Sequence, residues 1–187
     1  LRGQVYGGAG YVEESGVAQH YRDARIPPIY EGTNGIQAMD LVGRKLAQNG
    51  GRAIQAFFRL VAEEAGEAKG KDGTTEIAAA LERANGELQQ ATMWLMQNAM
   101  QNPNNAGAAA YSYMTLMGIV TLGLMWLRMA KASGAVLADG AENAAFHQAK
   151  LVTARFFAER IMPEAGALRR KIEAGSESIM ALPVEAF

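Results

Sequence analysis

Apolar residues recur at helical spacing over most of this chain, but not over its first part. From Gly51 onward they lie three and four positions apart, among many Ala, Met, Leu and Gln and few β-branched residues, which favours helices over strands. Up to about Lys45 the chain is rich in Gly, Pro and Tyr, which predicts short helical pieces between turns. The pair Gly50-Gly51 is the candidate boundary, and we expect one domain at residues 1–48 and a second at residues 49–187.

The second domain predicts four long helices, over residues 51–69, 75–102, 105–137 and 141–174. Residues 70–73, 102–104 and 138–140 are polar turns that separate them. Asp139 followed by Glu142 predicts a capping box, and Pro163 predicts a kink near Met162. Helices joined by short loops run antiparallel and bury their apolar stripes together. The predicted fold class is therefore all-α, an up-down helical bundle.

One stretch of the third helix is long enough to cross a membrane. Residues 106–127 contain no charged side chain. Glycine, serine and threonine dilute the stretch, aromatic and basic anchors are missing at both ends, and the mean hydropathy of the chain is −0.08. We therefore expect a buried helix of the bundle and no membrane span.

Composition narrows the function classes. The formal net charge is −1 and the pI is near 6.2, which argues against a nucleic-acid surface. The absence of cysteine excludes disulfides, thiolate metal ligands and a cysteine nucleophile, and favours the cytoplasm as location. His20 and His147 lie far apart, and neither stands in a Glu-x-x-His arrangement, so no metal site is expected. Because the chain begins with Leu1 rather than Met, we expect it to be a piece of a longer polypeptide.

Two elements of the first domain are candidates for chemistry. Gly7, Gly8 and Gly10 allow a close backbone approach, which suits either a phosphate cradle or a tight turn, and the residues alone favour the turn. The spacing is not that of a Rossmann fingerprint. Glu31 follows the stiff, apolar run 26–30 and precedes Gly32-Thr33, where Thr33 can cap a helix to about Lys45. Apolar neighbours would desolvate this carboxylate and suit it to act as a general base, whereas the alternative is an ordinary helix-start glutamate, which the residues alone favour.

The two elements together resemble the C-terminal signature of the acyl-CoA dehydrogenase family. The resemblance rests on the glutamine and glycine element at 4–11 and on Tyr30-Glu31-Gly32-Thr33. It implies a flavoprotein of fatty acid metabolism that removes hydrogens from Cα and Cβ of an acyl-CoA thioester with FAD. By match of motif, Glu31 abstracts the Cα proton while the β-hydrogen leaves as hydride to the flavin.

The resemblance implies further roles for residues that match it. Gln4 and Gly8 correspond to contacts with FAD held by a neighbouring subunit, and Tyr30 and Gly32 to the thioester end of the substrate pocket. Contacts with flavin phosphates at a helix start correspond to Thr33, Asn34 and Gly35. Gly35 stands where many relatives have glutamine, which removes one flavin contact from the pattern, and Gln19 stands where many have a basic residue. A structural ion-pair cluster is expected among Arg22, Asp23 and Arg25.

The resemblance also concerns the rest of the chain and its partners. Residues 1–48 resemble the end of the catalytic helical domain, and residues 49–187 resemble the added C-terminal helical domain of a subgroup of larger bacterial members. The implied partners are an acyl-CoA substrate, electron-transferring flavoprotein and further copies of the chain, as a dimer or a dimer of dimers. Two alternatives stay open: a helical interaction or oligomerisation module without catalysis of its own, and an acyl-CoA oxidase.

Overall fold

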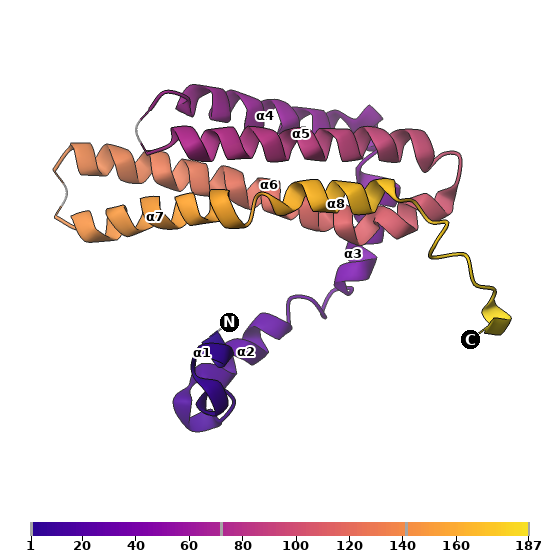
Figure 1. Ribbon diagram of the computed structural model, residues 1–187, viewed down its shortest axis with the longest axis horizontal. Coiled ribbons are helices and arrows are strands. Elements are labelled where there is room, and N and C mark those ends of the chain that lie inside the picture. Colours follow the sequence, from indigo (N-terminus) through magenta and orange to yellow (C-terminus); the bar gives the residue numbers. More distant parts are fainter. Residues whose placement is uncertain (1, 72, 141, 187) are drawn as a thin grey trace. The chain divides into compact units, whose positions relative to one another are not determined.

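The computed structural model describes residues 2–71, 73–140 and 142–186. Every regular element in these ranges is helical, which confirms the predicted all-α class (Figure 1). The chain forms two compact units, Leu1–Gln37 and Ala38–Phe187. This division lies about ten residues before the domain boundary that the sequence suggested, and that boundary stays a prediction.

The second unit is a bundle of long helices joined by short turns. Its helices are α4 (Arg52–Ala68), α5 (Thr75–Asn98), α6 (Pro103–Ala138), α7 (Ala144–Arg160) and α8 (Glu164–Glu173). In Figure 1, α4, α5 and α6 lie side by side, and α7 and α8 follow one another along α6. The predicted up-down bundle is therefore present, with the last of its four predicted helices divided in two.

Helix α6 forms the centre of the bundle. Its buried face includes Tyr113, Leu116, Val120, Leu124 and Leu127, which pack against α4, α5, α7 and α8. The helix is long and apolar enough to cross a membrane, with a mean hydropathy of 1.4 over its most apolar 18 residues, and 44% of that window is buried in the bundle. Many of the apolar side chains that raised the question of a membrane span are thus part of the core of the bundle.

The break between α7 and α8 lies where proline predicted a kink. Helix α7 ends at Arg160, Pro163 cannot donate a backbone hydrogen bond, and α8 begins at Glu164. Met162 at the kink is buried against Gly123 of α6, where an added Cβ would lie 2.7 Å from Met162 Cε. Gly123 therefore provides the space that the kinked segment fills.

Two helix starts differ from the prediction. Helix α6 begins at Pro103 rather than at 105, because the Asn102 side chain accepts a hydrogen bond from the Asn104 N–H at 3.0 Å and proline is compatible with the first helical turn. The capping box at Asp139 and Glu142 is wrong. Asp139 instead ends α6, where its N–H donates to Ala135 O, and α7 begins only at Ala144.

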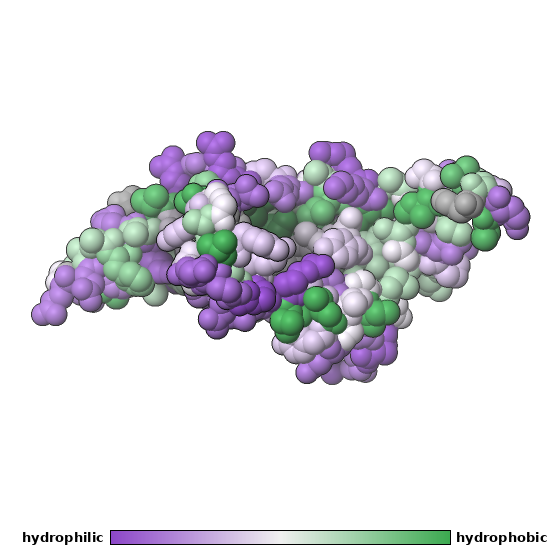
Figure 2. All heavy atoms as spheres, turned by 90° about the horizontal axis from the view of Figure 1, so that it is seen from below, coloured by the Kyte–Doolittle hydropathy of each residue, from purple (hydrophilic) through white to green (hydrophobic). Residues whose placement is uncertain are grey.

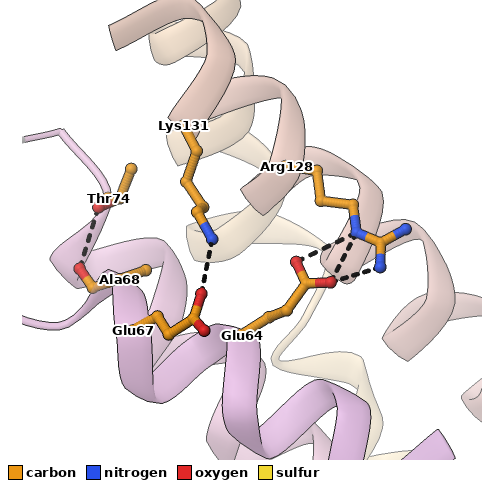
Figure 3. A network of polar contacts seen from close by, with 6 residues as sticks. All are labelled: Glu64, Glu67, Ala68, Thr74, Arg128 and Lys131. Atoms are coloured by element: carbon orange, nitrogen blue, oxygen red, sulfur yellow. Dashed lines mark hydrogen bonds and ion pairs between the residues drawn. The ribbon is translucent and has the colours of Figure 1, made fainter. Parts of the chain in front are cut away.

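Polar contacts connect α4 to α6 across the surface of the bundle (Figure 3). Arg128 Nε donates to both carboxylate oxygens of Glu64, at 2.9 and 3.1 Å, and Lys131 Nζ lies 3.3 Å from Glu67 Oε2. From the first pair to the second, both α4 and α6 advance by three residues. The two helices therefore run in the same direction where these pairs form. Hydrogen bonding to Arg128 lowers the pKa of the Glu64 carboxyl.

The part of the chain that precedes the long helices consists of short elements. These are α1 (Arg2–Val5), the 3-10 turns η1 (Gly7–Gly10) and η2 (Glu13–Ser15), and α2 (Val17–Arg25). A loop then leads to α3 (Asn34–Asp40), which continues through the π-helical turn η3 (Leu41–Lys45) and the 3-10 turn η4 (Gln48–Gly51). A further 3-10 turn, η5 (Val184–Ala186), lies near the end of the chain. Short helical pieces between turns are what the sequence predicted for this part.

Candidate active site

The loop between α2 and α3 has an unusual backbone at the glutamate that the sequence singled out. Glu31 has a φ of 56° and Gly32 a φ of 91°, so two consecutive residues lie in the left-handed region. This conformation is uncommon for a residue with a side chain and persists only where neighbouring groups hold it. Such strain is concentrated at binding and catalytic sites in proteins, which makes Glu31 the most distinctive residue of the first unit.

Hydrogen bonds hold the loop in this conformation. The Gln37 side chain donates from Nε2 to the carbonyl of Glu31 at 2.7 Å, and the Asn34 N–H donates to Pro28 O at 3.2 Å. The N–H groups of Ile29 and Tyr30 both donate to Ile26 O, at 2.9 and 3.2 Å. The backbone of Glu31 is therefore fixed from both sides, and its carboxylate is left free of these bonds.

Gly32 is required by this geometry. An added Cβ would lie 3.2 Å from Gln37 Nε2 and 3.4 Å from Ile36 Cγ2, and the positive φ would strain any other residue. Gln37 is the residue whose part the sequence reasoning missed. The only signal was its place at the end of the motif, because the bond from its side chain to Glu31 depends on a backbone turn that spacing does not reveal.

The surroundings of Glu31 differ from the expectation in one respect. Glu31 is exposed, and its apolar neighbours Ile29 and Tyr30 are themselves 50% and 55% exposed. Within this chain they do not cover the carboxylate, so the expected desolvation is absent here. Tyr30 and Gly32 nevertheless lie directly beside Glu31, where the sequence placed the substrate contacts.

The predicted phosphate contacts lie at the start of α3. Thr33 is exposed and immediately precedes the helix, and its carbonyl accepts the Gln37 N–H at 3.0 Å. Asn34 and Gly35 form the first turn of α3, where helix N–H groups have no partner within the helix, but the Asn34 N–H already donates to Pro28 O. The predicted helix to about Lys45 is interrupted after Asp40, because Leu46 N–H bonds to Leu41 O at 2.8 Å and opens a π-helical turn.

The glycine element forms tight turns beside a surface hollow. Gln4, Gly7 and Gly10 line this hollow together with residues of η2 and α2. Gly7 has a φ of 58°, a conformation that favours glycine, so the tight turn alone accounts for a glycine at this position. Gly8 has no positive φ, and an added Cβ there, as at Gly7, would meet no atom within 4 Å. The chain itself leaves open space at Gly8, as a close approach by another molecule requires.

The predicted ion-pair cluster has a different membership. Arg22 forms a two-pronged pair with Glu13 of η2, with Nη1–Oε1 at 2.6 Å and Nη2–Oε2 at 3.1 Å. The hydrogen bond and the charge of Arg22 lower the pKa of Glu13. Arg22 thus has the structural role that was expected, but its partner is Glu13 rather than Asp23. In the ranges that the structure describes, no cluster of three or more His, Asp or Glu side chains could hold a metal ion.

Two family models match this chain, one on each side of the linking turns. Residues 52–183 match the model described as "Acetyl-CoA dehydrogenase C-terminal like", and residues 3–47 match "Acyl-CoA dehydrogenase, C-terminal domain". The first covers well over half of the chain. The chain belongs to the acyl-CoA dehydrogenase family.

The relatives of this chain fall into two groups, those that match nearly all of it and those that match only a short part. The 3-methylmercaptopropionyl-CoA dehydrogenase of Ruegeria pomeroyi is 40% identical over 95% of the chain and 30% of its own length. The broad-specificity linear acyl-CoA dehydrogenase of Mycobacterium tuberculosis is 30% identical over 98% of the chain and 31% of its own length. The short-chain specific acyl-CoA dehydrogenase of Megasphaera elsdenii is 61% identical over only 36 residues, 19% of the chain and 9% of its own length. The chain therefore spans less than a third of the relatives that it matches throughout.

Proposed function

We propose that this chain acts as the C-terminal part of a flavin-dependent acyl-CoA dehydrogenase in which Glu31 is the catalytic base. The observation that carries the proposal is the backbone of Glu31, held at positive φ by Gln37 and followed by an obligatory glycine. A structural glutamate at a helix start has no need of this strain, whereas a catalytic group is often held in such a conformation. The family to which the chain belongs supports the same reading.

The proposed substrate is an acyl-CoA thioester. The relatives matched throughout the chain are named as dehydrogenases of 3-methylmercaptopropionyl-CoA and of linear acyl-CoA. Their acyl groups differ, so the names support the thioester class rather than one chain length or type.

In the proposed reaction the Glu31 carboxylate removes a proton from Cα of the thioester. The fixed Glu31 carbonyl and the absence of a side chain at Gly32 leave the carboxylate free to point toward a substrate. Tyr30 would border the thioester end. Bound FAD would supply the acceptor for the hydride that leaves Cβ. Because Glu31 is exposed in this chain, we infer that another part of the intact protein covers it and excludes water.

The residues predicted to bind FAD are compatible with that cofactor. Gln4 and Thr33 are exposed and offer neutral polar groups, and the space above Gly8 is open. The start of α3 adds the backbone N–H of Gly35, a group of the kind that binds phosphate, whereas the Asn34 N–H donates to Pro28 O and leaves its side chain for such a contact. Gln4 and Gly8 lie in other elements of the first unit than Thr33. This separation agrees with the proposal that Gln4 and Gly8 contact the flavin of a neighbouring subunit, whereas Thr33 contacts a different flavin.

The remaining parts of the proposal concern partners. An oxidoreductase of this class would pass its electrons to electron-transferring flavoprotein and would work as a homo-oligomer, a dimer or a dimer of dimers, in the cytoplasm. Since the chain spans under a third of its full-length relatives, we expect the chain alone to bind no FAD and to show no turnover. Purified chain should be colourless, and a yellow, active preparation would overturn this expectation.

The decisive experiment replaces Glu31 by Gln in the intact polypeptide that contains this chain. With an artificial electron acceptor, acyl-CoA oxidation should fall at least about 10²- to 10⁴-fold, because the side chain keeps its shape but no longer accepts the proton. FAD content should not change. Glu63→Gln, an exposed glutamate on α4, is the matched control and should keep full activity.

The alternatives give different results in the same experiment. Unchanged activity of Glu31→Gln would reject the catalytic role. If the intact wild-type protein assembles but does not dehydrogenate acyl-CoA, the result would support a helical interaction module. An acyl-CoA oxidase would lose activity with Glu31→Gln as well, and would differ in consuming oxygen and releasing hydrogen peroxide in the absence of another acceptor.

A further inference from the structure

The side chain of Gln37 connects the loop that carries Glu31 to helix α3. Its Nε2 donates to Glu31 O at 2.7 Å, and the Gln37 N–H donates to Thr33 O at 3.0 Å. One residue of the helix therefore binds the carbonyl groups on both sides of Gly32. Hydrophobic and hydrophilic residues are mixed over the surface in Figure 2, so exposure alone does not mark a site, whereas this connection singles out one residue.

The bond from Gln37 acts on the torsion that sets the direction of the Glu31 side chain. The carbonyl that it holds belongs to the planar peptide group between Glu31 and Gly32, and the orientation of that group about the Cα–C bond is the ψ angle of Glu31. A change in ψ would turn the carbonyl away from Gln37 Nε2. Because the φ of 56° is itself unfavourable for glutamate, the bond offsets this strain and keeps Cβ of Glu31 in one direction relative to α3.

Gly32 provides the space that the Gln37 amide occupies. An added Cβ would lie 3.2 Å from Gln37 Nε2, which is closer than most real Cβ contacts, and the φ of Gly32 is 91°. A side chain at this position would displace the amide from Glu31 O. Gln37 and Gly32 therefore act on the same hydrogen bond, and the effect of changing one depends on the other.

The helix that carries Gln37 is also the one proposed to contact the flavin. Thr33 immediately precedes α3, and Asn34 and Gly35 begin it. Since Gln37 lies within one turn of these residues, its bond to Glu31 fixes the base relative to them. Transfer of a proton depends on such placement, because an error of about 1 Å in the position of a reacting group can cost about 10²-fold in rate.

We propose that Gln37 is a positioning residue for Glu31, which holds the base at a fixed place relative to the start of α3, and that Gly32 leaves the space for its amide. The inference rests on the proposed catalytic role of Glu31 and adds a second residue to it. Gln37 acts through the backbone of Glu31 and takes no part in the proton transfer.

The test replaces Gln37 by Met in the intact polypeptide that contains this chain, because methionine has a similar length but no N–H to donate. With an artificial electron acceptor, kcat should fall about 10- to 100-fold, while KM and FAD content should stay within about twofold. The isotope effect with a substrate deuterated at Cα should rise, because removal of the proton becomes the slower step. Gln89→Met, at an exposed glutamine of α5, is the matched control and should change none of these values.

A second measurement tests whether Gln37 and Gly32 act on one bond. Gly32→Ala should lower kcat as well, because the added Cβ displaces the Gln37 amide. The double variant Gly32→Ala with Gln37→Met should then lie within about threefold of Gly32→Ala alone, since the bond is already lost. If the two losses multiply instead, the two residues act separately and the proposal is wrong.

Comparison with Glu31→Gln separates this inference from the proposed function. If Glu31→Gln is inactive while Gln37→Met keeps the kcat and the isotope effect of the wild type, Glu31 is still the base and the positioning role is wrong. A loss of FAD in proportion to the loss of activity of Gln37→Met would show that Gln37 maintains the fold rather than the base, which also contradicts the proposal. Full activity of Glu31→Gln would overturn both.

Discussion

The two units of this chain differ in how far their apolar side chains are exposed. In the first unit, Val17 and Ala18 are buried, while Val5, Tyr11 and Tyr21 are between 71% and 88% exposed. The bundle instead has a continuous core in which Leu81, Leu88 and many other side chains are entirely enclosed. The bundle thus contains the apolar contacts that a folded domain needs, and the first unit does not.

The difference in apolar exposure agrees with the role proposed for the first unit. Exposed apolar residues around Glu31 indicate a segment that is completed by groups outside itself, as a substrate-binding loop of a larger enzyme would be. The family models divide the chain near the same place, because one matches residues 3–47 and the other residues 52–183. The proposed chemistry and the continuous apolar core therefore lie in different parts of the chain.

Hydrogen exchange should show the largest effect of this difference. Amides in the centre of α5 and α6 should exchange only when the bundle unfolds, because their helices are buried on several sides. Amides of α1 and α2 should exchange on the order of 10³-fold faster or more, since few apolar contacts oppose their opening. Mass spectrometry of peptides from each unit measures this ratio. Equal protection in both units would show that the first unit is stabilised by contacts that its own residues do not explain.

A pair of substitutions on α6 tests the core more closely. Leu124 is 2% exposed and Leu122, two residues earlier, is 53% exposed. Leu124→Ala should lower the free energy of unfolding by about 2–5 kcal/mol, because it removes buried methyl groups and leaves a cavity. Leu122→Ala should change it by less than about 0.5 kcal/mol. Urea unfolding measures both, and equal losses would contradict the assignment of the buried face.

The sequence predicted the helices of the bundle well because their signals are local. Helix α4 was predicted at 51–69 and lies at Arg52–Ala68, and Pro163 marked the break in the last helix. The end of α5 was predicted four residues too late, at 102 instead of Asn98. There Asn105, from the next helix, donates to Asn98 O at 3.3 Å and accepts from the Ser176 N–H at 3.0 Å. The bond between Asn105 and Ser176 joins residues 71 positions apart, so a local pattern cannot reveal it.

The candidate site was predictable only as a motif. Family resemblance identified Glu31 and its neighbours, whereas the positive φ of Glu31 and the bond from Gln37 depend on how the loop closes. The pairing of Arg22 with Glu13 was missed for the same reason, because a turn and a change of direction separate them. Side-chain types suggested the chemistry, and the backbone that holds it had to come from the structure.

The smallest effect expected concerns a single buried hydroxyl of the bundle. Tyr113 is fully buried, and its hydroxyl lies 2.7 Å from Thr92 Oγ1, which itself donates to Leu88 O at 2.8 Å. Since the Thr92 hydrogen is used by Leu88, Tyr113 is the donor in the neutral state. Burial raises the pKa of Tyr113 to about 12, above the value near 10 of an unfolded tyrosine. The folded state therefore holds the proton more tightly, and this contribution to stability is complete below pH 10 and is lost as the pH rises toward 12.

Tyr113→Phe should cost about 1 kcal/mol at pH 8 through the lost hydrogen bond. Between pH 10 and 12 the wild type should lose roughly 2–3 kcal/mol more than the variant, so their order of stability should reverse. Urea unfolding across this range, with the exposed Tyr111→Phe as control, measures the difference. Parallel curves for the wild type and Tyr113→Phe would mean that water reaches this hydroxyl, and that the core around α6 is more open than its packing indicates.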